Sequence, residues 1–266
     1  MRARVTATFL AGVVLLALAG CGADEGGGGE PAAGGGEPRL VVSAATSLKK
    51  ALTAYGEGFE DADVRLSFAG SDELAAQIRQ GVKPDVFASA NTTLPDQLFE
   101  EGLVERPRVF TGNRLVLAVP ASGAERAVAS LEDLAAPGVR IAIGAESVPV
   151  GAYTRTVLER LPAAQRRAIL ANVGSNEPDV GGVVGKLSQG AVDAGFVYAT
   201  DVEGAGGALR GIDLPAALRP AVAYGVAIVT GAQEPAAARR FVDGLVSGPG
   251  KDALRAAGFE PPAAGR

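Results

Sequence analysis

The chain has 266 residues, a formal net charge of −5 and no histidine. The negative charge argues against nucleic acid as a partner, and no basic cluster is longer than a pair such as Lys49-Lys50. The lack of histidine excludes a Ser-His-Asp triad and the usual zinc sites. With Cys21 as the single cysteine, the chain cannot form an internal disulfide.

Residues 1–21 have the pattern of an export signal. Arg2 and Arg4 precede an apolar run at residues 9–18, and Leu18-Ala19-Gly20-Cys21 ends the segment with small residues. This ending resembles the bacterial lipobox, in which the cysteine is lipidated; a plain secretory signal is the alternative. Residues 22–38 are Gly, Glu, Ala and Pro with almost no apolar side chain, which predicts a flexible tether. We therefore expect an exported body held on the outer face of the cytoplasmic membrane by a lipid on Cys21.

From residue 39 onward, short apolar runs alternate with helical periods, which is typical of an α/β fold with largely parallel strands. Hydrophobic spacing predicts strands at 40–42, 64–68, 84–89, 114–119, 139–143, 195–198 and 221–229. It predicts helices after each of the first three strands and at 153–161, 183–187, 236–246 and 251–257.

We interpret this order as two α/β lobes, the second inserted in the first. The strands at 114–119 and 221–229 would be the two crossings. This assigns residues 39–113 and 221–266 to lobe I and residues 114–220 to lobe II. A single wound sheet is the alternative, because periodicity alone does not count lobes.

Hydroxyl groups follow the first two predicted strands. Ser43, Thr46 and Ser47 lie after one strand, and Ala69-Gly70-Ser71 lies after the next. A helix N-terminus after a strand offers free backbone N–H groups and can bind an anion without a charged side chain. The simpler interpretation is that Ser47 and Ser71 only cap their helices.

The second half of the chain has matching turns. Val148-Pro149-Val150-Gly151 and Asp179-Val180-Gly181-Gly182 each precede a predicted helix, and Tyr198 ends a predicted strand. Tyr198 could instead be an aromatic residue at the edge of the core. Ligands of open α/β sheets bind at the carboxyl ends of the strands, so these neutral donors predict an oxyanion site.

Several motifs follow one another along nearly the whole folded part. They are Val42-Ser43-Ala44-Ala45-Thr46-Ser47-Leu48, Phe68-Ala69-Gly70-Ser71, Pro84-Asp85-Val86-Phe87-Ala88-Ser89-Ala90, Gly112-Asn113-Arg114-Leu115-Val116-Leu117, Val148-Pro149-Val150-Gly151-Ala152-Tyr153, and Val197-Tyr198 with Asp201. As a set and in this order they resemble the motifs of the molybdate-binding proteins of ABC importers. The resemblance runs from about residue 40 to Gly258-Phe259.

This resemblance implies a periplasmic binding protein of class II, with mixed and mostly parallel sheets, that closes on molybdate or tungstate. Matching the motifs residue by residue, Ser47 and Ser71 would each supply a hydroxyl and an amide, Val150 and Val180 would supply amides, and Tyr198 its hydroxyl. The resemblance also implies a monomer that is not an enzyme, has no cofactor and uses no residue as a direct metal ligand. Its partners would be the permease and the ATPase of the importer.

One departure from the family pattern leaves the anion open. The second motif usually continues with Ser, Gly or Thr, whereas Asp72-Glu73 follow Ser71 here. Acidic residues in a first helical turn favour the helix dipole. If Asp72 faced the cleft, it would repel a dianion or accept the proton of a phosphate. A binding protein for sulfate or phosphate is therefore the alternative.

Two short patterns point elsewhere. Ser47-Leu48-Lys49-Lys50 matches the S-x-x-K motif of serine acyl enzymes, which requires Lys50 beside the serine oxygen, but the K-T-G motif is missing. Residues 181–186 partly match a phosphate-binding P-loop. We reject that match because Val180 stands in place of the first glycine and Leu187 in place of the magnesium-binding Ser or Thr.

Overall fold

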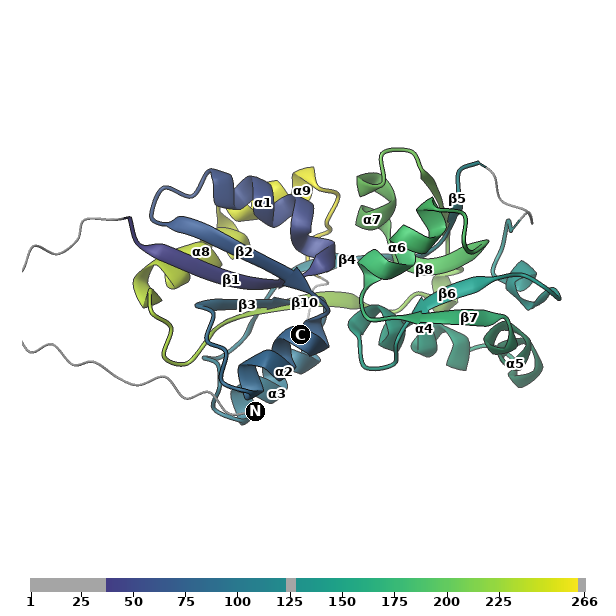
Figure 1. Cartoon of the computed structure of the whole chain (residues 1–266), viewed down its shortest axis with the longest axis horizontal. Helices are drawn as coiled ribbons and strands as arrows, with labels where there is room; N and C mark the ends of the chain where they lie inside the picture. Colours follow the sequence, from purple (N-terminus) through teal and green to yellow (C-terminus); the bar gives the residue numbers. More distant parts are fainter. Residues whose placement is uncertain (1–36, 123–127, 263–266) are drawn as a thin grey trace, which may run out of the picture. The chain divides into compact units, whose positions relative to one another are not determined.

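A computed structural model of the protein describes residues 37–122 and 128–262 (Figure 1). The predicted export signal, Cys21 and residues 22–36 of the predicted tether lie outside the described residues. The lipid anchor therefore stays a prediction. Within the described ranges, no helix combines the length and the apolar character that crossing a membrane requires.

The first sheet has the strand order β2-β1-β3-β10-β4. Its strands are β1 (Arg39–Ala45), β2 (Asp63–Ala69), β3 (Val86–Ser89), β4 (Arg108–Asn113) and β10 (Val222–Ile228). Around it lie η1 (Thr46–Leu48), α1 (Lys49–Glu57), α2 (Ser71–Arg79), α3 (Thr93–Glu100), α8 (Pro235–Ser247) and α9 (Pro249–Ala256). We call this sheet with its helices lobe I.

The second sheet has the order β7-β6-β8-β5-β9. Its strands are β5 (Leu115–Pro120), β6 (Ile141–Gly144), β7 (Val173–Glu177), β8 (Ala194–Tyr198) and β9 (Leu209–Asp213). The helices are η2 (Glu132–Ala135), α4 (Pro149–Glu159), α5 (Ala163–Ala171), α6 (Val180–Ser188), α7 (Ala199–Gly204) and η3 (Ala216–Leu218). This group is lobe II.

The chain passes from the first sheet to the second between β4 and β5 and returns between β9 and β10. The predicted α/β fold, with the second lobe inserted in the first, is thus confirmed, and the alternative of one wound sheet is wrong. The lobe limits at 113/114 and 220/221 stay a prediction.

Antiparallel pairing is more frequent than the sequence predicted. In lobe I, β1 is parallel to β2 and β3, whereas β10 is antiparallel to β3 and β4. In lobe II, β6 is parallel to β7 and β8, whereas β5 is antiparallel to β8 and β9. The two strands next to the crossings, β5 and β10, therefore account for all the antiparallel pairs of these sheets.

The helices pack against the parallel strands that precede them, as the apolar patterns of these strands and helices predict. In β1, Leu40 and Val42 are fully buried, and α1 turns Leu52 and Tyr55 toward the same core. Near the end of the chain, Phe241 of α8 packs on Tyr55 with ring centroids 4.5 Å apart. Helix α8, near the end of the chain, thereby stabilises lobe I, which also contains β1 and α1.

Candidate ligand-binding site

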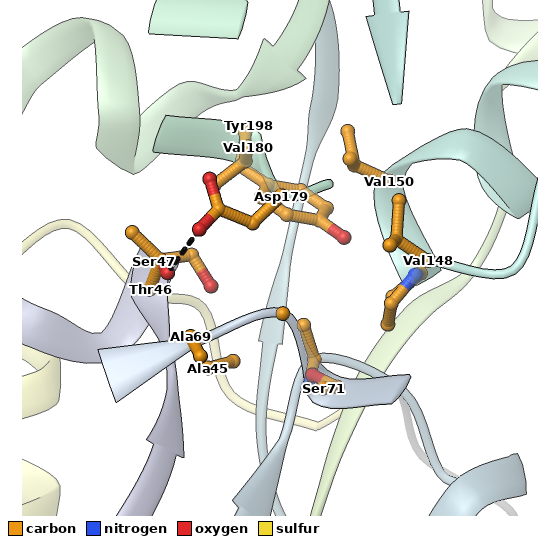
Figure 2. A pocket seen from close by; sticks show the side chains of 13 residues that line it. Ala45, Thr46, Ser47, Ala69, Ser71, Val148, Val150, Asp179, Val180 and Tyr198 are labelled. Atoms are coloured by element: carbon orange, nitrogen blue, oxygen red, sulfur yellow. Dashed lines mark hydrogen bonds between the residues drawn. The ribbon is translucent and has the colours of Figure 1, made fainter. Parts of the chain in front are cut away.

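A small pocket lies where strands of both lobes end and helices begin (Figure 2). All five residues that the sequence predicted as ligand contacts line it: Ser47, Ser71, Val150, Val180 and Tyr198. The pocket has a volume of about 20 Å³. A single water needs about 10–15 Å³, so this space suits a small ion.

In lobe I, the two serines follow β1 and β2. Ser47 lies in η1, and Ser71 is the first residue of α2. The capping residue before η1 is Ala45 and the one before α2 is Gly70, and neither helix has a side-chain cap. The interpretation that Ser47 and Ser71 only cap their helices is therefore wrong, and their hydroxyls are available for another purpose.

Both serine hydroxyls are buried and bonded inside the protein. Ser71 Oγ accepts the backbone N–H of Ala90 at 3.1 Å. Ser47 Oγ lies 3.0 Å from the hydroxyl of Tyr224. Because a hydroxyl donates one hydrogen and accepts at its oxygen, Ser71 still has its own hydrogen to donate into the pocket.

In lobe II, two helix N-termini border the pocket. Helix α4 begins at Pro149, so Val150 lies in its first turn, and Val180 is the first residue of α6. N–H groups of a first turn have no partner within their helix. At α6 the N-cap is Asp179, whose Oδ1 accepts the N–H of Gly182 at 2.9 Å. The amides of Val150 and Val180 can therefore serve a ligand.

Tyr198 ends β8 and turns its hydroxyl into the pocket (Figure 2). Its side chain is 1% exposed, and the hydroxyl has no hydrogen-bond partner among the described residues. Burial raises the pKa of Tyr198 well above its usual value, so the phenol stays neutral and keeps its hydrogen. A buried hydroxyl without a partner is unfavourable, which indicates that a ligand is its acceptor.

The one acidic residue that lines the pocket, as far as the described residues extend, is Asp179, and no lysine or arginine lines it. Asp179 Oδ2 accepts the hydroxyl of Thr46 at 2.9 Å, which joins lobe II to lobe I (Figure 2). Asp72 is the residue for which the sequence left open whether it faces the cleft. It does not line the pocket. The sequence pattern does not single out the carboxylate of Asp179, because Asp before a helix is a common N-cap.

Glycines permit the two lobes to approach each other at the pocket. A Cβ atom on Gly70 would lie 2.5 Å from the carbonyl oxygen of Pro178 in lobe II. A Cβ atom on Gly181 would lie 3.0 Å from the Cγ2 atom of Thr46 in lobe I. The first distance is shorter than real contacts allow, so only glycine at position 70 permits this approach.

The acyl-enzyme interpretation of Ser47 requires a lysine beside the serine oxygen. Lys50 is exposed, and the hydrogen bond that Ser47 Oγ makes is with Tyr224. Over the ranges that the structure covers, no three His, Cys, Asp or Glu residues group as a metal site. The geometry of the pocket therefore provides hydrogen-bond donors and not a nucleophile with a base.

Two α/β lobes with a small pocket of hydrogen-bond donors and apolar side chains at their facing strand ends define a solute-binding receptor. The model of the family of bacterial extracellular solute-binding proteins matches residues 40–260. The chain belongs to this family, which is a family of solute-binding transport proteins and not of enzymes.

Individual relatives agree with the resemblance that the motifs predicted. The molybdate-binding protein ModA of Mycobacterium tuberculosis is 33% identical over 263 residues, covering 97% of this chain and 96% of that protein. The substrate-binding domain of a putative molybdenum ABC transporter from Clostridium difficile is 28% identical, with a TM-score of 0.62, and covers 84% of this chain and 98% of that one. The periplasmic molybdate-binding protein of Azotobacter vinelandii has a TM-score of 0.74 at 24% identity, covers 84% and 99%, and supports the fold alone.

Proposed function

We propose that this protein captures molybdate, or the equivalent tungstate, outside the cytoplasm and delivers it to an ABC importer. The observation that carries the proposal is the pocket itself, in which five neutral donor residues from both lobes surround a space for one small ion. The names of the relative from Mycobacterium tuberculosis and of the domain from Clostridium difficile support molybdate as the ion.

Neutral donors are sufficient for tight binding. Micromolar affinity corresponds to about 8 kcal/mol. A hydrogen bond to a charged group contributes about 1.5–3 kcal/mol, so five residues can exceed this value and offset part of the association cost. A dianion held by dipoles, without a fixed countercharge, is also released readily when the lobes reopen.

Delivery of the ion requires partner proteins. We infer that the permease and the ATPase of an importer receive the ion, since the domain from Clostridium difficile belongs to an ABC transporter. Lipidation of Cys21 would hold the protein near the permease, with residues 22–38 as the tether. Replacement of Cys21 by Ser would then release the protein from the membrane fraction, whereas a plain secretory signal would yield a protein that is already free.

Asp179 favours one alternative ligand. Monohydrogen phosphate carries a proton that needs an acceptor, and the carboxylate of Asp179 lines the pocket. Molybdate, tungstate and sulfate have no such proton at neutral pH and need donors only. If phosphate were the ligand, Asp179→Asn would abolish its binding, whereas molybdate binding would persist.

Calorimetry on the full chain with molybdate, tungstate, sulfate and phosphate tests the proposal. We expect molybdate and tungstate to bind with micromolar or tighter affinity. Ser71→Ala and Tyr198→Phe should each weaken binding by about 1.5–3 kcal/mol, because each removes one donor to a charged ligand. Tyr198→Phe should not lower the melting temperature of the free protein, since its hydroxyl has no partner to lose.

Tyr153→Phe is the matched control, because Tyr153 is a neighbouring tyrosine whose side chain does not line the pocket. Binding of sulfate or phosphate in place of molybdate would replace the proposed ligand. Unchanged affinity in both Ser71→Ala and Tyr198→Phe would show that the ion binds elsewhere.

A further inference from the structure

Ser47 is the last member of a buried row of hydrogen bonds that begins where the chain leaves lobe I. Asn113 is the final residue of β4, and Tyr224 lies in β10. Both side chains are buried, at 5% and 0% exposure. The Tyr224 hydroxyl oxygen lies 3.0 Å from Ser47 Oγ and 3.4 Å from Asn113 Nδ2.

The orientation of the Asn113 amide follows from its other contacts. Its Oδ1 accepts the backbone N–H of Arg114 at 2.8 Å, and its Nδ2 donates to Thr200 Oγ1 at 2.9 Å. A side-chain amide has one acceptor oxygen and two N–H donors. The atom that faces Tyr224 is therefore the nitrogen, and its second hydrogen is donated to the Tyr224 oxygen.

Either hydroxyl can be the donor in the next bond. The Tyr224 oxygen already accepts from Asn113, which favours the arrangement in which the hydrogen of Tyr224 points at Ser47 Oγ. Ser47 then accepts at its oxygen and keeps its hydrogen for the pocket. Ser71 has the same arrangement, since its Oγ accepts the N–H of Ala90. Both serine turns thus present hydrogens to the pocket, which is the polarity that an oxyanion requires.

We propose that Asn113 and Tyr224 are positioning residues that orient the hydroxyl of Ser47 so that it donates to a fully deprotonated oxyanion. This inference rests on the proposed function and adds a source of specificity to it. An anion that turned a proton toward Ser47 would meet the hydrogen of Ser47, whose oxygen already accepts from Tyr224 in this arrangement. The arrangement therefore disfavours protonated anions at this wall of the pocket.

Asn113→Asp tests the direction of the row, because it changes one donor into an acceptor with almost no change in shape. One carboxylate oxygen would accept the N–H of Arg114, and the other would draw the hydrogen of Tyr224. The hydrogen of Ser47 would then turn to Tyr224 and away from the ligand. We expect calorimetry on the full chain to show molybdate affinity reduced about tenfold or more.

A second substitution distinguishes orientation from simple damage. In Asn113→Asp with Tyr224→Phe, Ser47 has no phenol oxygen to which it could donate, so most of the lost affinity should return. A purely structural role predicts further loss instead. In a Ser47→Ala background, Asn113→Asp should cost less than in the wild-type background, and the remaining cost measures the effect of the added charge alone.

Two outcomes would overturn the proposal. One is an Asn113→Asp affinity that Tyr224→Phe does not restore. The other is tighter binding in Tyr224→Phe alone, which would mean that Ser47 donates to Tyr224 in the wild-type protein. The second outcome is measured on Tyr224→Phe alone, which keeps the buried aromatic ring. The proposal therefore remains testable if Asn113→Asp does not fold.

A measurement without ligand separates this inference from the proposed function. By NMR, the slowly exchanging hydroxyl proton of Tyr224 should show a cross-peak to the Cβ protons of Ser47. A cross-peak to the ring of Tyr198 instead would overturn the inference even if molybdate binds. Failure of the wild-type chain to bind molybdate, with the expected cross-peak present, would contradict the proposed function and leave the orientation of Ser47 established.

Discussion

The hydroxyl groups of the pocket differ in whether their oxygens already have partners inside the protein. The hydroxyl oxygens of Ser47 and Ser71 have hydrogen-bond partners, whereas the hydroxyl of Tyr198 has no hydrogen-bond partner among the described residues. A buried polar group without a partner costs about 1–3 kcal/mol. A ligand that accepts a hydrogen bond from Tyr198 removes this cost. Ligand binding is therefore strengthened by the same amount of free energy that the unpaired hydroxyl costs the ligand-free protein.

The carboxyl group of Asp201, which is hydrogen-bonded to the backbone of Tyr198, makes the stability of the protein depend on pH. Its Oδ2 accepts the backbone N–H of Tyr198 at 2.9 Å. Burial raises the pKa of Asp201 from 3.8 to about 7, against the lowering effect of that hydrogen bond. Between these values, the native state holds a proton that the unfolded chain has released. The resulting stabilisation is full below the unfolded pKa and is lost as the pH rises through about 7.

Asp201→Asn should remove this dependence. The melting temperature of the wild-type protein should fall more steeply between about pH 4 and about pH 7 than that of the variant, because only the wild-type carboxyl must ionise in its partly buried position. Asp252→Asn is the control, since Asp252 is an exposed aspartate of α9. Parallel melting curves for the wild type and Asp201→Asn would contradict the assignment.

At the scale of elements, the pocket depends on how closely the strand-to-helix turns of the two lobes approach. The carbonyl oxygen of Pro178, just before α6, fills the space where a side chain of residue 70 would lie. The hydrogen bond from Thr46 to Asp179 joins the same two regions. Gly70 therefore permits this approach because glycine is the one residue type without a side chain.

Gly70→Ala should weaken molybdate binding by about tenfold or more, because the added methyl group keeps the turns apart. The backbone of Gly70 has an ordinary conformation for alanine, so the effect of the substitution comes from the contact with Pro178 and not from backbone strain. Gly185→Ala in α6 is the matched control. A Cβ atom on Gly185 would have no atom within 4 Å, and alanine is the better helix former. Equal affinity in both variants, measured by calorimetry, would argue against the close approach.

At the scale of the whole molecule, charge and fold act in opposite ways on an anion. The protein carries a formal net charge of −5, and no lysine or arginine of the described residues lines the pocket. The long-range field is therefore mildly repulsive, and the affinity has to come from aligned donors at short range. The two inserted lobes make this possible, because each contributes helix N-termini to one small space.

The dependence of binding on salt tests this view. Raising the salt concentration from about 0.05 M to about 0.5 M should leave molybdate affinity unchanged or slightly increase it, because salt screens the repulsion by the net charge. A site built on lysine or arginine would lose affinity over the same range. Isothermal titrations with sodium chloride distinguish the two signs, and a clear loss of affinity with salt would contradict a site of neutral donors.

The sequence by itself determined the α/β class, the two inserted lobes, and the turns at Ser47, Ser71, Val150, Val180 and Tyr198. These features depend on local signals, namely apolar runs, helical spacing and the residues that begin helices. The edge strands β4, β7 and β9 and the helices α5 and α7 were not predicted. The strands β7 and β9 are half-buried with polar side chains and lack an apolar run. The turn that contains Asp179 was recognised, but not the position of its carboxylate at the pocket.

Only the tertiary structure decided which groups meet across the lobes. The bonds from Thr46 to Asp179 and from Asn113 to Tyr224 join residues 133 and 111 positions apart. No local pattern encodes such contacts, because they depend on how the two sheets are joined by β4, β5 and β10. For the same reason, the burial of the Tyr198 hydroxyl and the row of side chains from Asn113 through Tyr224 to Ser47 became visible only in the folded chain.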